Sequence, residues 1–476
     1  MKQSVETTSG TIRGEQEGGV LRYAGIPFAH VPQRFRRPRP LNSGIGQLPN
    51  RWGPAPWQPL PGYDELGAER AEDCLNLNVW SPVGADRVPV IVWVYGGGWE
   101  HGSNASPGTR GDVLAATGRA VIVSVNYRVT ALGWAELAHC GGELSEASNL
   151  GLHDIVTALE WIQANIAPFG GDPSRVTVMG ESAGGFNLSA LLGSRRGRAT
   201  FSGIAAFSGG ASRIIPLTAA QQLGDRILIA LGGDTLRCCP EELVAAQSSV
   251  VPTDIGRRNG VVPESLGVVD DSALPHGILD EHPMEALAAG RAAHKAVWFG
   301  STRDEASLFA AHAPDVYAEE SFDELVGTVK QWTGSHEKSG SAVEAYTSDA
   351  GADAAPLERL VTDWVYALPS ARGALCQAAA GGRAYLSMFG RADGKLAGHA
   401  ADVPALFGRL STTTGPEDRA RRDEVREAVL RFAEEGSPGW SAVGKAPTSM
   451  TLGPDKFDST RAYSAVLDRW QGVPRP

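Results

Sequence analysis

Apolar residues in the first half of the chain form short runs separated by polar, glycine-rich segments. Residues 88–94 (VPVIVWV) and 120–125 (AVIVSV) are almost continuously apolar, which is typical of strands buried on both faces of a parallel sheet. Between residues 153 and 166, apolar side chains such as Ile155 and Leu159 recur at the spacing of one helix face. The pattern therefore predicts alternating strands and helices.

This alternation continues further along the chain. Residues 175–180 (RVTVMG) predict a third strand, and residues 186–193 (FNLSALLG) predict the helix after it. Later strands are expected at residues 203–209, 296–300 and 384–389. A repeated strand–helix–strand order predicts an α/β fold, with a mostly parallel central sheet flanked by helices on both faces.

Two irregular stretches, residues 30–70 and 233–285, interrupt the pattern. The chain of 476 residues contains 58 glycines and 30 prolines, so long loops are expected. In α/β enzymes such excursions often build the substrate pocket above the strand ends. We interpret both stretches as loop and helix insertions over an active site, within a single domain spanning residues 1–476.

Composition narrows the class of partner. The formal net charge is −11 with 42% hydrophobic residues, which indicates a globular protein and argues against nucleic acid or an anionic membrane as partner. The N-terminal residues lack the apolar segment of a secretory signal, and no apolar run approaches the length of a membrane span. Five irregularly spaced cysteines do not suggest a disulfide framework, so a reducing cytoplasm is expected. The metal-binding spacings CxxC and HExxH are absent, and we expect no metal or cofactor.

The segment VTVMGESAGGFN places Ser182 between Gly180 and Gly184, where the predicted strand meets the predicted helix. A sharp turn there lifts the serine above the sheet edge, and a Cβ at either glycine would clash with the neighbouring chain. The turn also directs the first backbone N–H groups of the helix towards the serine oxygen. This context favours a nucleophilic serine over an ordinary glycine loop.

A nucleophilic serine needs donors for the oxyanion that forms when it attacks a carbonyl. Residues 95–103 (YGGGWEHGS) directly follow the apolar strand 88–94. Consecutive glycines let bare backbone approach a reacting carbonyl, so the N–H groups of Gly97, Gly98 and Ala183 are predicted to form an oxyanion hole. A flexible glycine turn is the alternative interpretation.

Candidates for the acid and the base follow later strands. Asp304 and Glu305 come just after the strand at 296–300, and His399 lies in a loop after the strand at 384–389. Serine, then acid, then histidine is the chain order of α/β-hydrolases. Spacing alone does not choose between the two acids, and it does not single out His399 among the ten histidines.

Several longer segments together resemble the type-B carboxylesterases, the α/β-hydrolase branch that includes bacterial para-nitrobenzyl esterases, liver carboxylesterases and cholinesterases. The resemblance extends over nearly the whole chain and implies the α/β-hydrolase fold. It rests on these segments, which occur in the family's order: SGTIRGEQEGGVLRYAGIPFAHVP, AEDCLNLNVWSP, NYRVTALGW, NLGLHDIVTALEWIQANIAPFGGDPSRVTVMGESAGG and FAEEGSPGW.

The resemblance assigns the nucleophile to Ser182 and the oxyanion donors to the three amides named above. The family acid is the glutamate of a D-E-G motif, which here reads DEA, so Glu305 is favoured over Asp304. The family histidine begins an H-G-x-E motif, which corresponds to His399 followed by Ala400 and Asp402 in HAADVPALFG.

Other family positions imply supporting roles. Ser208 matches a serine that often supports the triad, and Glu181 matches the glutamate beside the nucleophile. Trp99, next to the oxyanion glycines, either lines the pocket or packs in the core. Arg128 and Asp154 lie in segments that usually carry buried structural ion pairs, so they receive no catalytic role.

The cysteines depart from the pattern of the secreted family members. Those members pair the cysteine of the E-D-C motif with one upstream, and here no cysteine precedes Cys74. This absence favours an intracellular, bacterial-type member of the family.

The resemblance implies a serine carboxylesterase that hydrolyses small-molecule carboxylic esters through a Ser-His-Glu triad and an acyl-enzyme, as a monomer or small homo-oligomer. One alternative is a specialised hydrolase of the same fold that acts on a carbamate, a xenobiotic ester, or a biosynthetic lactone or thioester. Another is a catalytically inactive binding protein, which is disfavoured because all three triad positions are filled.

Overall fold

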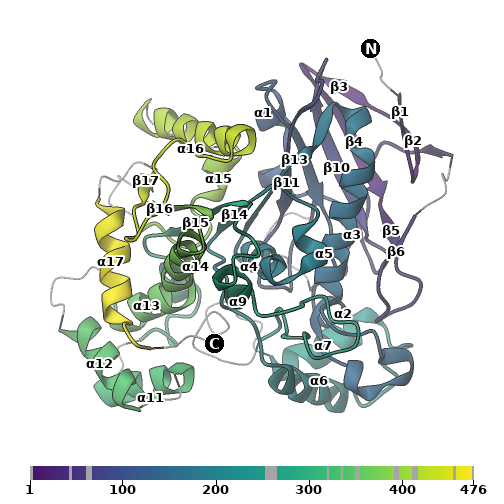
Figure 1. Ribbon diagram of the computed structural model, residues 1–476. Helices are drawn as coiled ribbons and strands as arrows, with labels where there is room; N and C mark the ends of the chain where they lie inside the picture. Colours follow the sequence, from purple (N-terminus) through teal and green to yellow (C-terminus); the bar gives the residue numbers. More distant parts are fainter. Residues whose placement is uncertain are drawn as a thin grey trace.

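A ten-stranded sheet forms the centre of the computed structural model, in the order β17-β16-β15-β14-β13-β11-β12-β10-β4-β3. Helices cover it on both sides, and the N-terminal strands and the C-terminal helix lie at opposite edges of the molecule (Figure 1). The structure describes residues 4–41, 46–59, 67–251, 265–318, 321–333, 336–348, 354–390, 396–409, 416–453 and 457–473.

The strands of this sheet have the following bounds: β3 Glu15–Glu17, β4 Val20–Pro27, β10 Asn76–Pro82, β11 Val88–Val94, β12 Val121–Val125, β13 Gly171–Glu181, β14 Gly203–Phe207, β15 Ala296–Thr302, β16 Arg383–Phe389 and β17 Met450–Leu452. Every pairing from β12 through β11 to β17 is parallel. The pairings of β10 with β12, β10 with β4, and β3 with β4 are antiparallel. The predicted mostly parallel sheet is confirmed.

Continuous apolar sequence corresponds to burial on both faces of the sheet. Every residue of β12, β14 and β15 is buried, and only the first residue of β11 and of β16 is not. These strands lie where the apolar runs predict them, because helices cover both faces of this part of the sheet.

The helices have the following bounds: α1 Asp112–Ala115, α2 Ala131–Trp134, α3 Leu150–Asn165, α4 Ala183–Ala190, α5 Arg195–Arg198, α6 Leu217–Leu231, α7 Pro240–Val250, α9 Pro283–Ala288, α10 Ser307–His312, α11 Phe322–Thr333, α12 His336–Thr347, α13 Pro356–Val361, α14 Leu368–Ala379, α15 Val403–Leu406, α16 Pro416–Glu435 and α17 Ser459–Arg469. Helix α4 packs against β13 and β14, α14 against β15 and β16, and α16 against β11 and β13. No helix in the described part of the chain is long and apolar enough to cross a bilayer.

Small sheets of two or three strands flank the main sheet. One has the order β1-β2-β7, and the other two pair β5 with β6 and β8 with β9. Their bounds are β1 Ser4–Thr7, β2 Gly10–Arg13, β5 Ala29–His30, β6 Arg39–Pro40, β7 Gln47–Leu48, β8 Ala55–Pro56 and β9 Arg70–Ala71.

Part of the stretch predicted to be irregular, residues 233–285, is helical. Helix α7 begins at Pro240, in the first helical position where the missing N–H costs nothing, and the side chain of Glu242 accepts the N–H of Cys239 at 2.9 Å. These helix-start signals stabilise α7, although the apolar residues of the stretch show no regular spacing. Residues 252–264, together with 42–45 and 60–66 of the first irregular stretch, lie outside the described residues.

Arg128 and Asp154 form a buried ion pair, as predicted. The Nη2 of Arg128 lies 2.7 Å from one carboxylate oxygen of Asp154 and its Nε lies 2.8 Å from the other. Their side chains are 5% and 0% exposed. The pair joins helix α3 to the segment before α2, so its role is structural.

Candidate active site

Five neighbouring parallel strands, β11, β13, β14, β15 and β16, end at the same edge of the sheet. Open α/β sheets bind their ligands beyond the carboxyl ends of the strands. The segments that follow these strands carry, in that strand order, Gly97 with Gly98, then Ser182, Ser208, Glu305 and His399.

Ser182 occupies a strained turn between β13 and α4. Its φ is 55° and its ψ is −127°, a conformation that residues with a side chain rarely adopt. A Cβ on Gly180 would lie 2.8 Å from the carbonyl carbon of Gly184, and a Cβ on Gly184 would lie 2.1 Å from the backbone oxygen of Val94. The steric reason predicted for the two glycines therefore holds.

Three of the predicted side chains form one chain of short contacts. The Nε2 of His399 lies 2.8 Å from the Oγ of Ser182. The Nδ1 of His399 lies 2.6 Å from the Oε2 of Glu305. All three residues are buried. The imidazole is therefore placed to take a proton from the hydroxyl while the carboxylate faces its other nitrogen.

The two acids after β15 have different positions. Glu305 faces the imidazole, whereas the carboxylate of Asp304 accepts the backbone N–H of Ala397 at 3.0 Å. The backbone N–H of Asp304 in turn donates to Ala397 at 3.0 Å, and that of His399 donates to Glu305 at 3.1 Å. Asp304 thus joins the acid loop to the histidine loop.

Ser208 and Thr302 hold the carboxylate of Glu305. The hydroxyl of Ser208 donates to Oε1 of Glu305 at 2.6 Å, and the backbone N–H of Thr302 donates to the same oxygen at 2.8 Å. The second oxygen is left to face His399. These two donors fix the orientation of the carboxylate.

Additional carboxylates surround His399. The Oε1 of Glu181 lies 3.2 Å from its Nε2. Burial lowers the pKa of His399, but the charge of Glu181, the hydrogen bond and charge of Glu305, and the charge of Asp402 outweigh it and raise the pKa to about 9. Burial and the charge of Glu305 raise the pKa of Asp402 to about 7. The surrounding carboxylates therefore stabilise the imidazolium ion that forms when His399 takes a proton.

A cavity of about 280 Å³ opens beside the serine. Its lining includes Gly96, Gly97, His101, Ser182, Leu308 and His399. This volume lies just below the range of about 300–1,000 Å³ typical of ligand pockets.

The glycine segment after β11 forms a tight turn at this cavity. The φ of Gly97 is 107° and that of Gly98 is 63°. A Cβ on Gly97 would lie 2.4 Å from the backbone oxygen of His101, so the turn requires glycine there. Ala183 is the first residue of α4, where a backbone N–H has no acceptor within the helix.

Trp99 packs in the core and is not part of the cavity lining. It is 2% exposed, its Nε1 donates to the side chain of Asn187 at 2.8 Å, and its ring stacks on Phe186. Between the two interpretations of the sequence, the structure favours packing. His101, two residues further on, does line the cavity.

Two aromatic rings beside the imidazole are not predicted from the sequence. Phe309 and Tyr366 lie 5.1 and 4.9 Å from the ring of His399, measured between ring centroids. Phe309 belongs to α10 and Tyr366 to the π-helical segment Thr362–Ala367. Phe309 lies four residues after Glu305 but in no recognised motif, and Tyr366 follows no strand of the site, so no local signal marks them.

Comparisons with known proteins agree with this geometry. A model of the carboxylesterase family matches residues 1–456. The para-nitrobenzyl esterase of Bacillus subtilis (strain 168) is 34% identical over 333 residues, covering 67% of this chain and 66% of that protein. The fumonisin B1 esterase of Sphingopyxis macrogoltabida is 35% identical over 333 residues, covering 65% of this chain and 57% of that protein. The matched part of this chain thus spans less than two thirds of either relative.

A solved structure named PNB esterase covers the chain more completely. It superposes with a TM-score of 0.85 at 27% identity, over 98% of this chain and 100% of the other. The predicted α/β-hydrolase fold and the predicted family are both confirmed. The chain belongs to the carboxylesterase family.

Proposed function

We propose that the protein is a serine carboxylesterase that hydrolyses small-molecule carboxylic esters through an acyl-enzyme. The single observation that carries this proposal is the continuous contact from the hydroxyl of Ser182 through His399 to Glu305, at 2.8 and 2.6 Å. It lies at the wall of a cavity and within a chain that belongs to the carboxylesterase family.

In the first half of the reaction, His399 takes the proton of Ser182 while the Oγ attacks the ester carbonyl carbon. The backbone N–H groups of Gly97, Gly98 and Ala183 stabilise the oxyanion that forms. The imidazolium then gives its proton to the leaving alcohol, and the acyl group stays on Ser182. Glu305 keeps the imidazole in the correct tautomer and stabilises its cation.

In the second half, water takes the place of the alcohol. His399 accepts a proton from the water as its oxygen attacks the acyl carbon. The same amides stabilise the second oxyanion. When this intermediate collapses, His399 returns the proton to the Oγ of Ser182, and the carboxylic acid leaves. Apart from the ester and water, the steps described here use residues of this chain.

The test uses Ser182→Ala with a short-chain aryl ester and a fluorophosphonate probe. Loss of the attacking oxygen is expected to lower kcat by about 10⁶-fold, as for other serine hydrolases. It is also expected to abolish labelling by the probe. Ser249→Ala is the matched control, because Ser249 lies exposed on helix α7 and its hydroxyl donates to the backbone of Ala246. Near-normal turnover by Ser182→Ala would refute the proposal.

We also propose that the protein acts in a reducing cytoplasm of the bacterial type, as a single domain and as a monomer or small homo-oligomer. All five cysteines are free, and Cys74, in the position of the family's disulfide-forming cysteine, is buried. Free buried thiols are typical of reducing compartments. Subcellular fractionation tests the location, and light scattering tests the oligomeric state.

A further inference from the structure

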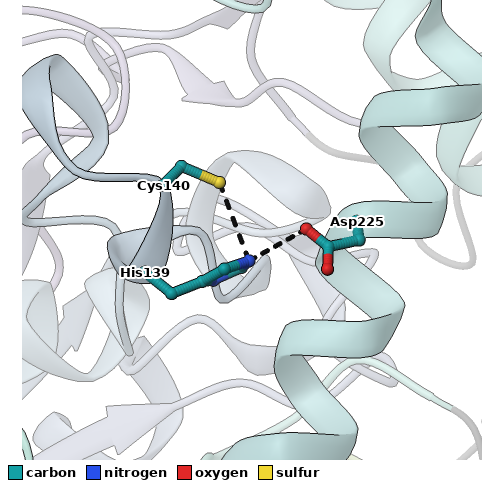
Figure 2. Close-up of side chains that lie close together, drawn as sticks. All are labelled: His139, Cys140 and Asp225. Atoms are coloured by element: carbon teal, nitrogen blue, oxygen red, sulfur yellow. Dashed lines mark hydrogen bonds and ion pairs between the residues drawn. The ribbon is translucent and has the colours of Figure 1, made fainter.

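Three potential metal donors converge on the surface, on elements that carry no part of the triad. His139 and Cys140 belong to the short 3-10 helix η2 (Ala138–Cys140), and Asp225 reaches them from helix α6. Figure 2 shows the sulfur and the carboxylate both directed towards one imidazole nitrogen. One donor atom from each residue lies within 4.8 Å of the others.

The sulfur–nitrogen separation matches that of a tetrahedral zinc site, and the oxygen–nitrogen separation is shorter. Zinc bonds of about 2.3 Å to sulfur and about 2.0–2.1 Å to nitrogen place the two donors roughly 3.6 Å apart at a tetrahedral angle. The Sγ of Cys140 lies 3.7 Å from the Nε2 of His139. A carboxylate oxygen would lie roughly 3.4 Å from the nitrogen at the same angle. The oxygen of Asp225 lies 2.9 Å from it, where the two atoms share a hydrogen bond.

Close packing holds the two ligand-bearing elements together. A Cβ on Gly224, the neighbour of Asp225, would lie 2.3 Å from the backbone oxygen of Glu136 and 3.0 Å from the side chain of Leu137. Leu137 is fully buried, and its backbone N–H donates to Ala147 at 2.9 Å. The backbone that presents the donors is therefore fixed before any ion binds, which lowers the cost of binding.

The chemistry of the group favours a cation, because the carboxylate of Asp225 would stabilise a divalent ion beside it. The donors themselves remain open to solvent, since the side chains of His139 and Asp225 are 27% and 54% exposed.

We propose that His139, Cys140 and Asp225 bind one zinc ion, with water as the fourth ligand. Thiolate and imidazole ligands suit zinc, and a carboxylate completes a three-residue set with one open position. Binding releases the thiol proton of Cys140 to solvent and requires a neutral imidazole with its proton on Nδ1. The ion joins η2 to α6 and takes no part in ester hydrolysis.

Cobalt(II) provides a test that reports the sulfur bond directly. Titration of the reduced full-length protein with Co²⁺ is expected to produce a sulfur-to-cobalt charge-transfer band that saturates at one equivalent. Cys140→Ser is expected to abolish this band. Cys239→Ser is the matched control, because Cys239 is also exposed, and it is expected to leave the band unchanged.

Zinc affinity tests the other two ligands. Competition with a chromophoric chelator is expected to show that His139→Ala and Asp225→Asn each weaken Zn²⁺ binding by more than about 10-fold, because even outer-shell partners of metal ligands are worth about 10- to 100-fold. Circular dichroism of each variant checks that it is folded. The proposal is overturned if the band survives Cys140→Ser, if it disappears with Cys239→Ser, or if the folded His139 and Asp225 variants bind Zn²⁺ as the unmodified protein does.

Discussion

Two histidine–carboxylate pairs of the molecule can be compared directly. In the first, His399 lies 2.6 Å from Glu305, and the side chains are 4% and 0% exposed. In the second, His139 lies 2.9 Å from Asp225, and the side chains are 27% and 54% exposed. The chemical groups match and the distances are similar, so burial is the main difference between them.

Burial changes what such a pair can do. Charges that attract each other weakly in water attract several-fold more strongly in a medium of lower effective dielectric constant. In the buried pair this attraction helps to raise the pKa of His399. Even a charged pair at an exposed position is typically worth only about 0.2–1 kcal/mol, so the contact between His139 and Asp225 is easily broken by a competing ligand. The first arrangement suits proton transfer and the second suits exchange with an ion.

The largest expected difference between the pairs concerns catalysis. Glu305→Gln is expected to lower kcat by about 10⁴-fold, because an amide stabilises the wrong imidazole tautomer. Asp225→Asn is the same change in the exposed pair and is expected to leave kcat unaltered. Steady-state hydrolysis of an aryl ester measures both. Equal losses in the two variants would contradict the assigned roles.

The second prediction compares the backbone turn at Gly97, beside the triad, with the turn at Gly141, beside the second histidine pair. Gly97→Ala is expected to lower kcat by about 10²–10³-fold, the effect of losing one oxyanion donor, because its Cβ would displace the turn against His101. Gly141→Ala is the matched control beside Cys140. Its φ of 70° is also positive, but a Cβ there would have no atom within 4 Å. Little change in the Gly97 variant would argue against an oxyanion hole at this turn.

A smaller effect is expected from the support of the buried carboxylate. Ser208→Ala removes the 2.6 Å hydrogen bond to Glu305. Hydrogen bonds to charged groups are worth about 1.5–3 kcal/mol, so kcat is expected to fall by about 10- to 100-fold. Ser208→Thr keeps the hydroxyl and is expected to recover part of the activity. An alanine variant with unchanged kcat would show that Thr302 alone positions the carboxylate.

The smallest expected change is a shift of the pH profile. His399 must lose a proton to act as a base, so kcat/KM is expected to rise with pH through its pKa of about 9. Glu181→Gln removes a negative charge that raises this pKa. The increase of kcat/KM is then expected at lower pH, by about one pH unit if the charge stabilises the imidazolium by ~1.4 kcal/mol. The control is Glu143→Gln, at a residue on the 3-10 helix Gly142–Leu144. This change is expected to leave the pH profile of kcat/KM in place. A profile that does not move would exclude an electrostatic role for Glu181.

The sequence predicts the parallel half of the sheet well and the antiparallel half poorly. The parallel strands are buried on both faces, so they appear as apolar runs. Strand β10 is also fully buried, but Asn76 and Asn78 interrupt its apolar pattern. The oxygen of Asn78 accepts the backbone N–H of Gly25 at 2.8 Å, a tertiary contact that periodicity cannot reveal. Within the parallel half, strand β17 is the exception, because it has only three residues, too few for any period to be seen.

The residues of the candidate site also differ in how well the sequence predicts them. The glycines around Ser182 and at position 97 could be predicted because a sharp turn after a strand has a steric requirement for glycine. The choice of Glu305 over Asp304 needed the family resemblance, since both follow the same strand. Tyr366 escapes prediction because only the folding of a distant segment brings it to His399.

The zinc ligands proposed here also escape prediction from sequence. His139 and Asp225 are 86 positions apart along the chain and belong to no spaced motif. The tertiary packing of Gly224 against Glu136 and Leu137 brings their elements together.

The arrangement of the triad on separate strand ends has a consequence for how this enzyme could diversify. Hydrogen bonding between β11, β13, β14, β15 and β16 sets the spacing of the reacting groups, and no single connecting segment does so. The parts of the connections beyond these groups can therefore lengthen, shorten or exchange with those of other hydrolases, provided that the residues from each strand end to its reacting group are kept. Libraries of variants that recombine such connections would test new substrates while the reaction of the triad is kept.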